Sequence, residues 1–176
     1  MRIRFNACDV DLQFKIKGWQ ATDGDDIRAQ LIWTEDEFSL KGKYIDYSLN
    51  SELLMNGEIV YLHEMLERVL RNELKEECVV GFAEPDLTFK LTPAKRLYDI
   101  PGKVIYRNGY VDREPEMEIT VRFWCGGGLG SNRFSMVFSP YEIDALYTYI
   151  SVIMGVIEKD DPKVIRFIED RVILPE

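Results

Sequence analysis

Several segments of this sequence alternate apolar and polar residues one by one, and this pattern constrains the fold more than any other feature. From Val10 to Lys17, and again from Glu116 to Phe123, every second residue is apolar. Because successive side chains of a strand point to opposite faces, each segment predicts a strand with one buried and one solvent-facing side. A parallel sheet, covered on both faces, has continuous apolar runs instead. The pattern therefore predicts an antiparallel sheet and argues against a doubly wound nucleotide-binding fold.

Other segments carry the same signature of half-buried strands. The further predicted strands are 27–33, 38–47, 78–82, 87–91 and 134–138. Gly42 is predicted to form a bulge inside the second of these. The Asn108-Gly109 pair predicts a tight hairpin turn between two short strands.

Two longer segments follow the three-and-four spacing of apolar residues that is typical of a helix with one buried side. The first is 57–74, where Asn56 is expected to accept the free N–H groups at the helix start. The second follows Ser139, a good capping residue, with Pro140 at the first helical position. A short third helix is predicted over 162–170.

These elements together predict an α+β fold with a curved antiparallel β-sheet, whole or split in two, packed by two main α-helices. A chain of 176 residues is long enough to bury a core without a disulfide or metal. No repeat or composition shift divides the sequence. We therefore expect one globular domain over residues 1–176, with 159–176 as a C-terminal helical tail.

The charge balance argues against two classes of partner, nucleic acids and anionic membranes. With 31 acidic and 22 basic residues the formal net charge is −9, which repels nucleic acid and anionic membranes. Residues 1–10 lack the apolar stretch of a signal peptide, and the apolar run 149–157 is shorter than the ~20 residues that cross a bilayer. We expect a cytoplasmic protein with no membrane contact. Its three widely spaced cysteines, Cys8, Cys78 and Cys125, fit neither a disulfide framework nor paired metal ligands.

Two features invite a catalytic or phosphate-binding interpretation. Glycines in the segment 126–131 could approach a phosphate, but no helix start or lysine follows, and a hairpin turn explains them better. His63 is the only histidine and lies off the apolar side of its helix. No nucleophile signature accompanies it, so we expect a solvated or edge-packed side chain and no metal site.

Paired carboxylates and exposed aromatic residues are the remaining candidates. Glu116 and Glu118 share the polar side of one strand, where they could serve glycoside hydrolysis or simply keep the strand soluble; the second interpretation is favoured. The acidic groups 23–26, 35–37 and 160–161 are expected at turns, solvated and without the spacing of a calcium loop. An aromatic partner surface could be formed by Trp19, Trp33, Trp124, Tyr44, Tyr47 and Tyr110.

One segment resembles a known family. Residues 82–91 read F-A-E-P-D-L-T-F-K-L and are similar to the F-x-E-P-[ND]-L-x-F-x-L segment of the wall-associated-protein (WapI-type) immunity proteins. Further pieces resemble the family in the same order, at 16–20, 26–33, 53–54 with 61–66, and 134–146. The likeness runs over residues 10–157, with residues 92–115 diverging from it.

The resemblance implies a cytoplasmic immunity protein that binds and neutralises a cognate toxin domain, commonly a nuclease. Such a protein needs no catalytic residue, metal or cofactor. A nuclease surface is usually basic, so an acidic protein can be steered to it and cover it. Under this hypothesis the partner-binding residues are Asp23, Asp25, Asp26, Glu35, Glu37, Glu116 and Glu118. Glu84 and Asp86, which flank Pro85 in the matching segment, are expected to have a structural role.

Two alternatives stay open. The chain could be a small-ligand or regulatory binding domain with a pocket between sheet and helices, which a concave apolar hollow would favour. It could also be a hydrolase built on Glu116 and Glu118, which would need the two carboxyl groups in a cleft.

Overall fold

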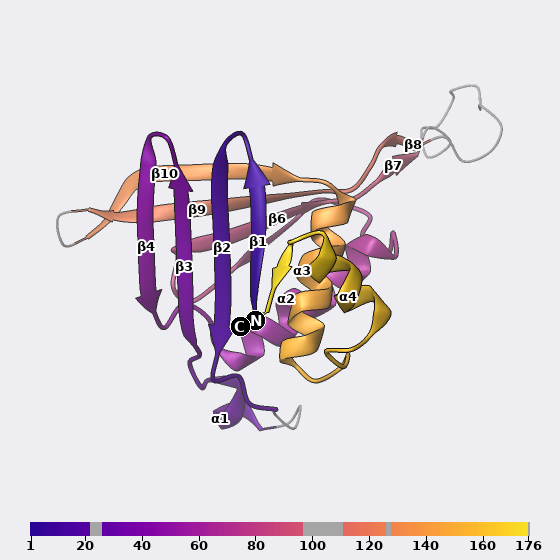
Figure 1. Ribbon diagram of the computed structural model, residues 1–176, viewed down its shortest axis with the longest axis horizontal. Coiled ribbons are helices and arrows are strands. Elements are labelled where there is room, and N and C mark those ends of the chain that lie inside the picture. Colours follow the sequence, from indigo (N-terminus) through magenta and orange to yellow (C-terminus); the bar gives the residue numbers. More distant parts are fainter. Residues whose placement is uncertain (22–25, 97–110, 126–127, 176) are drawn as a thin grey trace.

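The structure, a computed structural model, describes residues 1–21, 26–96, 111–125 and 128–175 and arranges them as two antiparallel sheets with helices packed on them (Figure 1). Asp23, Asp25, Tyr110 and the hairpin predicted at Asn108-Gly109 lie outside the described residues.

The first sheet has five strands. They are β1 (Arg2–Ala7), β2 (Val10–Lys17), β3 (Glu35–Gly42), β4 (Ile45–Ser51) and β11 (Ile173–Leu174). Their order is β11-β1-β2-β3-β4, and every neighbouring pair is antiparallel. The alternation in β2 is confirmed, because its apolar residues are buried and its polar ones face outward. The four strands β1 to β4 thus form a meander with one apolar and one polar face.

The second sheet has four strands, and its strands run across those of the first in Figure 1. They are β5 (Cys78–Gly81), β6 (Leu87–Thr92), β9 (Glu116–Cys125) and β10 (Gly128–Phe138), in the order β10-β9-β6-β5. A short ladder joins β7 (Lys95–Arg96) to β8 (Val111–Arg113). The predicted α+β class with antiparallel strands is therefore confirmed, and the sheet is split in two.

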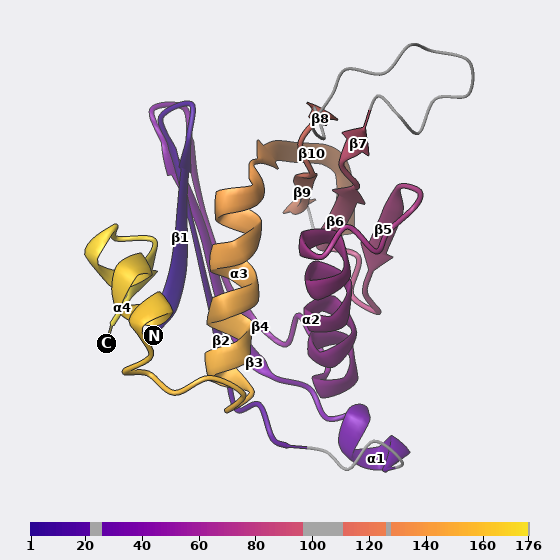
Figure 2. The same ribbon diagram turned by 90° about the vertical axis from the view of Figure 1, so that its right-hand side faces the viewer.

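Two helices fill the space between the sheets (Figure 2). These are α2 (Asn56–Leu70) and α3 (Pro140–Ile153), which pack on each other and carry the apolar sides that the sequence predicts. The core joins residues of both helices and both sheets in one cluster. The Tyr149 hydroxyl of α3 accepts the Ile16 N–H at 2.9 Å. Ile16 lies past the last residue of β2 that pairs with β1, so the hydroxyl takes the place of a strand partner. The short helix α4 (Pro162–Glu169), also as predicted, lies beside β11.

The helix starts show which local signals decide the boundaries. Ser139 caps α3 as predicted, since its Oγ accepts the Tyr141 N–H at 3.3 Å. Asn56, however, is not the cap of α2 but its first residue, and the cap is Met55. The Asn56 amide is buried and donates to the Ala29 carbonyl at 3.1 Å. The predicted end of this helix near residue 74 is also wrong, because Asn72 adopts a left-handed φ of 57° just after Leu70.

The predicted strand 27–33 is wrong. Residues Ile27–Gln30 form the short helix α1, whose start is fixed by Asp26. The Asp26 carboxylate accepts the N–H groups of Arg28 at 3.0 Å and Ala29 at 3.2 Å. Such a cap offers the backbone a local alternative to a strand ladder, which apolar alternation alone does not reveal.

The predicted strand 38–47 is in fact a hairpin, with β3 and β4 joined at Lys43 and Tyr44. Gly42 is therefore the last residue of β3 and not a bulge. A Cβ at Gly42 would lie 3.0 Å from the Asp9 carbonyl oxygen and 3.2 Å from a Val10 methyl group. Only glycine lets the adjacent β1–β2 and β3–β4 turns approach this closely.

Candidate functional site

None of the described helices covers the polar face of strands β1 to β4, which Figure 1 shows in front view. We call it the outer sheet face. Its outward side chains are Arg2, Arg4, Asn6, Asp11, Gln13, Lys15, Lys17, Glu35, Glu37, Ser39, Lys41, Asp46, Ser48 and Asn50. They alternate along each strand with the buried residues of the core, so strand geometry alone places them together.

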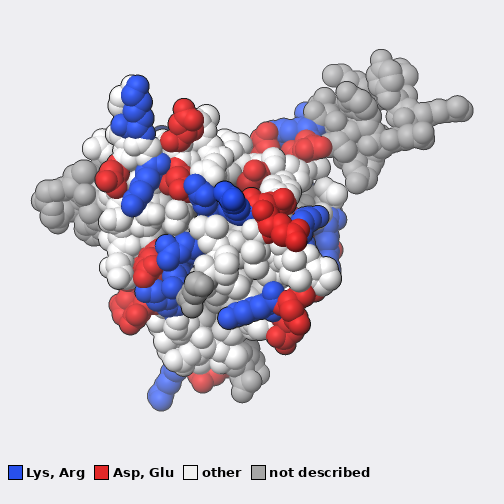
Figure 3. Space-filling model, in the orientation of Figure 1, with Lys and Arg blue, Asp and Glu red and all other residues white. Residues whose placement is uncertain are grey.

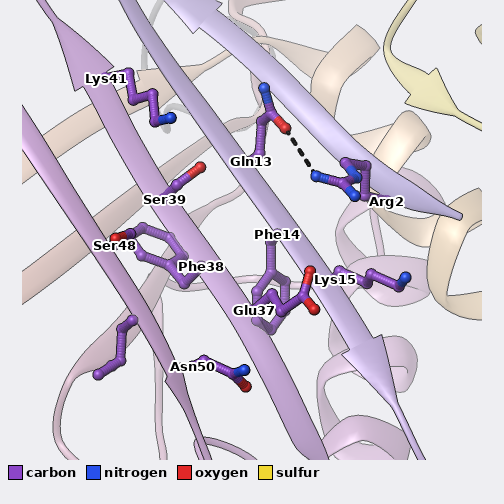
Figure 4. A pocket seen from close by; sticks show the side chains of 11 residues that line it. Arg2, Gln13, Phe14, Lys15, Glu37, Phe38, Ser39, Lys41, Ser48 and Asn50 are labelled. Atoms are coloured by element: carbon purple, nitrogen blue, oxygen red, sulfur yellow. Dashed lines mark hydrogen bonds between the residues drawn. The ribbon is translucent and has the colours of Figure 1, made fainter.

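The pairing register of β3 and β4 places two short side chains opposite each other on this face. Ser39 of β3 lies directly opposite Ser48 of β4, and both side chains are short. The next outward pair on one side is Lys41 with Asp46, and on the other side Glu37 with Asn50. Small residues between longer neighbours leave a hollow of about 360 Å³ over the two serines (Figure 4). We call it the serine hollow.

Polar side chains from the four strands β1 to β4 surround the serine hollow. Besides the two serines, its outward-facing lining residues are Arg2, Gln13, Lys15, Glu37, Lys41 and Asn50. The Arg2 guanidinium donates to the Gln13 side-chain oxygen at 3.4 Å, as the dashed line in Figure 4 marks. The lining thus offers hydroxyl, amide, ammonium and guanidinium donors around one small space.

The pKa of Glu37 shows that its surroundings are positively charged. Its carboxylate pairs with the Lys17 ammonium, and this hydrogen bond is the main cause that lowers the pKa of the Glu37 carboxyl. The charges of Lys15 and Arg2 lower that pKa further. Positive charge therefore dominates around this carboxylate, although the chain as a whole is acidic.

Charge is unevenly distributed between this face and the rest of the chain. The outer sheet face carries five basic side chains (Arg2, Arg4, Lys15, Lys17, Lys41) and four acidic ones (Asp11, Glu35, Glu37, Asp46). Figure 3 shows both signs interspersed on this side of the molecule. Since the formal net charge is −9, the excess of negative charge lies elsewhere on the chain.

The structure brings together only part of the predicted partner-binding set. Glu35 and Glu37 share the outer sheet face. Asp26 is exposed but serves as the cap of α1. Glu116 and Glu118 lie on β9, in the other sheet.

Glu116 and Glu118 face outward from the second sheet, as their strand pattern predicts. Glu118 lies across the ladder from Lys90 of β6 on one side and Val137 of β10 on the other. Lys90 in turn pairs with Glu77 at 2.9 Å. Neither glutamate lines the serine hollow or the cleft described below. Their surroundings are those of an open, solvated sheet face.

His63 is more enclosed than a solvated residue and links the two main helices. Its Nε2 lies 2.8 Å from the Ser151 hydroxyl of α3, and its ring stacks on Tyr147 at 4.6 Å. The Ser151 hydroxyl donates to the Tyr147 carbonyl at 2.7 Å, so the histidine N–H is the donor in the first contact. Burial lowers the pKa of His63. This pair is a structural contact, because a serine whose proton is held by a carbonyl is not poised for attack.

The prediction that Asp36 is solvated at a turn is wrong, because Asp36 lies within β3 and is completely buried. Its Oδ2 accepts hydrogen bonds from the Thr34 hydroxyl at 3.0 Å and from the backbone N–H groups of Leu53 and Leu54 at 3.1 Å each. Burial raises the pKa of the Asp36 carboxyl to about 6. The signal was present in the sequence, because Asp36 shares the inward parity of Phe38 and Leu40 on β3.

The segment that resembles the immunity family forms the corner between β5 and β6. The Glu58 carboxylate of α2 accepts the Ala83 N–H at 2.6 Å, and the Asp86 carbonyl accepts the Arg122 N–H at 2.8 Å. Phe82 meets Phe89 edge-on, with ring centroids 5.6 Å apart. These contacts hold the corner against the helix and the neighbouring strand.

A second hollow opens where the β1–β2 and β3–β4 turns approach strands β9 and β10. We call it the end cleft; its volume is about 790 Å³. Its apolar and aromatic lining residues are Val10, Tyr44, Ile45, Tyr47, Phe123 and Phe134. Tyr47 meets Phe123 edge-on at 4.8 Å, and Tyr44 is 89% exposed at the rim. Of the predicted aromatic surface, Tyr44 and Tyr47 come together here, while Trp19 lines a different hollow.

Among the described residues, no group of three or more histidine, cysteine, aspartate or glutamate side chains is arranged to hold a metal ion. The helices of the described ranges include none with the length and apolar character that a membrane crossing requires. No protein-family model, no curated protein and no solved structure matches this chain.

Proposed function

We propose that this chain is a non-catalytic binding protein of the immunity type, which neutralises a partner toxin domain by covering it with the outer sheet face. The observation that carries the proposal is the outer sheet face, which no helix covers in Figure 1 and whose polar side chains surround the serine hollow. Both main helices pack on the opposite side of this sheet. The face is therefore free to meet another molecule without any change in the core.

The character of the face suits a protein partner. Interfaces between separately folded proteins are about as polar as the rest of the surface and use many hydrogen bonds. The outer sheet face offers such groups on rigid strands, which fix their positions. The resemblance of residues 82–91 to an immunity family supports a toxin domain as the partner. The net charge of −9 supports electrostatic attraction of a basic domain over longer distances.

Co-expression with a candidate toxin domain from a neighbouring gene tests the proposal. The wild-type chain is expected to restore growth and to co-purify with that domain. Ser48→Trp fills the serine hollow and is expected to abolish both effects. Ser135→Trp places the same side chain on the exposed face of the second sheet and serves as the matched control. Failure of the wild type to protect, or full protection by Ser48→Trp, would contradict the proposal.

The end cleft favours a second candidate function, the binding of a small, largely apolar ligand. Its volume and aromatic lining are in the range of small-molecule sites. An apolar fluorescent dye, anilinonaphthalene sulfonate, is expected to bind there. Tyr44→Ser should then weaken the fluorescence, whereas Val137→Ser, on the exposed face of the second sheet, should not. Equal fluorescence in all three proteins would rule this candidate out.

A further inference from the structure

We infer that the serine hollow receives a carboxylate side chain of the partner protein. The inference rests on the proposed function and adds the chemistry of the central contact. It also changes what we expect of the partner's surface, because a uniformly basic surface would contain no carboxylate to enter the hollow. The anchoring residue would instead be an aspartate or glutamate within a surface of mixed charge.

The charges that line the hollow favour an anion. Three of the lining side chains are basic, namely Arg2, Lys15 and Lys41, and only Glu37 is acidic. Glu37 is already paired with Lys17. In the described part of the chain, no hydrogen bond or ion pair holds the Lys41 ammonium. A lysine or arginine of the partner would therefore meet like charges, whereas a carboxylate meets unlike ones.

The hydrogen-bonding groups also fit a carboxylate. Its two oxygens accept up to about four hydrogen bonds. Ser39 and Ser48 provide two hydroxyl donors and Asn50 provides an amide donor (Figure 4). The Gln13 amide nitrogen donates one N–H to Asp11 at 3.1 Å and has a second N–H to offer. Donors from strands β2, β3 and β4 thus surround one space, and the rigid ladder positions them before the partner arrives.

A protein carboxylate fits better than the phosphates of a nucleic acid. The outer sheet face interleaves its basic side chains with Asp11, Glu35 and Asp46, which would repel a continuous phosphate backbone. None of these three residues lines the hollow, and Asp11, which accepts the Gln13 amide N–H at 3.1 Å beside it, is paired with Arg4 at 3.0 Å. A single carboxylate meets the lining of the hollow, whereas a phosphate backbone would also pass over the acidic residues around it.

The test is a titration of the isotope-labelled full chain with a blocked hexaglutamate peptide, followed by NMR. The amide signals of Ser39, Lys41 and Ser48 are expected to shift. Lys41→Glu reverses a charge at the hollow and should weaken binding about fivefold or more. Lys43→Glu makes the same change two residues along the chain, on the exposed β3–β4 turn, and should change binding less than about twofold.

Four results would overturn the inference. These are no shift at the serine hollow, equal weakening by the two charge reversals, equal or tighter binding of a hexalysine peptide at this face, and tighter binding of a single-stranded oligonucleotide there. The proposed function fails separately. If toxin protection depends on Ser48 but hexaglutamate does not bind, only the inference is lost; if the peptide binds but the toxin is not neutralised, only the function is lost.

Discussion

At the scale of single residues, the buried carboxyl group of Asp36 shapes the chain around the outer sheet face. Two of its three hydrogen bonds fix residues 53–54, which lead from β4 into α2, and the third comes from the Thr34 hydroxyl. Because the group is completely buried, its charged form costs more free energy in the folded chain than in the unfolded one. The same carboxyl thus orders a connection and makes the stability of the fold depend on pH.

Asp36 gives the first prediction. Its pKa is raised from 3.8 to about 6, so its contribution to stability is fully present below pH 3.8 and is lost as the pH rises through 6. The free energy of unfolding of the wild type, relative to Asp36→Asn, should fall by about 3 kcal/mol between pH 3.5 and 7. Urea unfolding of both proteins across this range measures the difference. A difference that stays constant with pH would contradict the assignment.

His63 gives the second prediction. It is the only histidine, so its NMR signal can be assigned without ambiguity. Burial lowers its pKa, and the titration midpoint should therefore lie below 6.5. A group with a lowered pKa of this kind stabilises the fold above pH 6.5 and loses that contribution as the pH falls. A midpoint above 6.5 would mean that the ring is not enclosed between α2 and α3.

At the scale of elements, Glu58 connects the start of α2 to the second sheet. Its carboxylate accepts the Met55 N–H at 2.8 Å at the helix start and the Ala83 N–H at 2.6 Å at the β5–β6 corner. One side chain thus satisfies a free backbone donor of the helix and one of a turn.

Replacing Glu58 tests this connection. Glu58→Ala should lower the free energy of unfolding by about 1–3 kcal/mol, since two backbone donors lose a charged acceptor. Glu64→Ala, at an exposed position of the same helix, is the control and should change it by less than about 0.5 kcal/mol. Chemical denaturation of the two variants measures both values. Equal losses would show that Glu58 contributes only helix propensity.

The sequence predicts correctly those elements whose determining residues lie close together in the chain. The alternation in β2 and the capping residues of α3 act within a few positions, and both elements form as predicted. The two central residues of the hairpin turn, Lys43 and Tyr44, include no glycine, asparagine or proline, and Gly42 before them is equally compatible with a bulge inside one strand, so the sequence does not indicate the chain reversal between β3 and β4.

The serine hollow depends on the same turn and could not be foreseen. It exists because the ladder places Ser39 opposite Ser48, and this register follows from where the hairpin reverses. Glu35 and Glu37 were predicted as contact residues from their charge alone. Their actual neighbours, above all Lys17, come from another strand, and pairing across strands is not visible in the sequence.

At the scale of the whole molecule, the separation of charge assigns different roles to different surfaces. The outer sheet face is nearly balanced in charge, while the rest of the chain carries the negative excess. Under the proposed function, long-range attraction of a basic toxin domain would come from the whole chain, and the specific contacts would come from the face.

This separation predicts how salt affects binding. The association rate with the toxin domain should fall about tenfold or more between 50 mM and 500 mM salt, because the attraction acts over distances that salt screens. The dissociation rate should change much less, since it depends on the contacts of the face. Stopped-flow mixing measures the first rate and dilution the second. An association rate that is independent of salt would show that the negative excess does not guide encounter.

Lysine footprinting of the complex with the toxin domain tests the central claim most directly, because lysines lie on both sheets. Acetylation followed by mass spectrometry compares Lys15 and Lys41 of the outer sheet face with Lys90 of the second sheet. The account predicts that binding protects Lys15 and Lys41 while Lys90 stays as reactive as in the free protein. Protection of Lys90, with Lys15 and Lys41 still reactive, would contradict it.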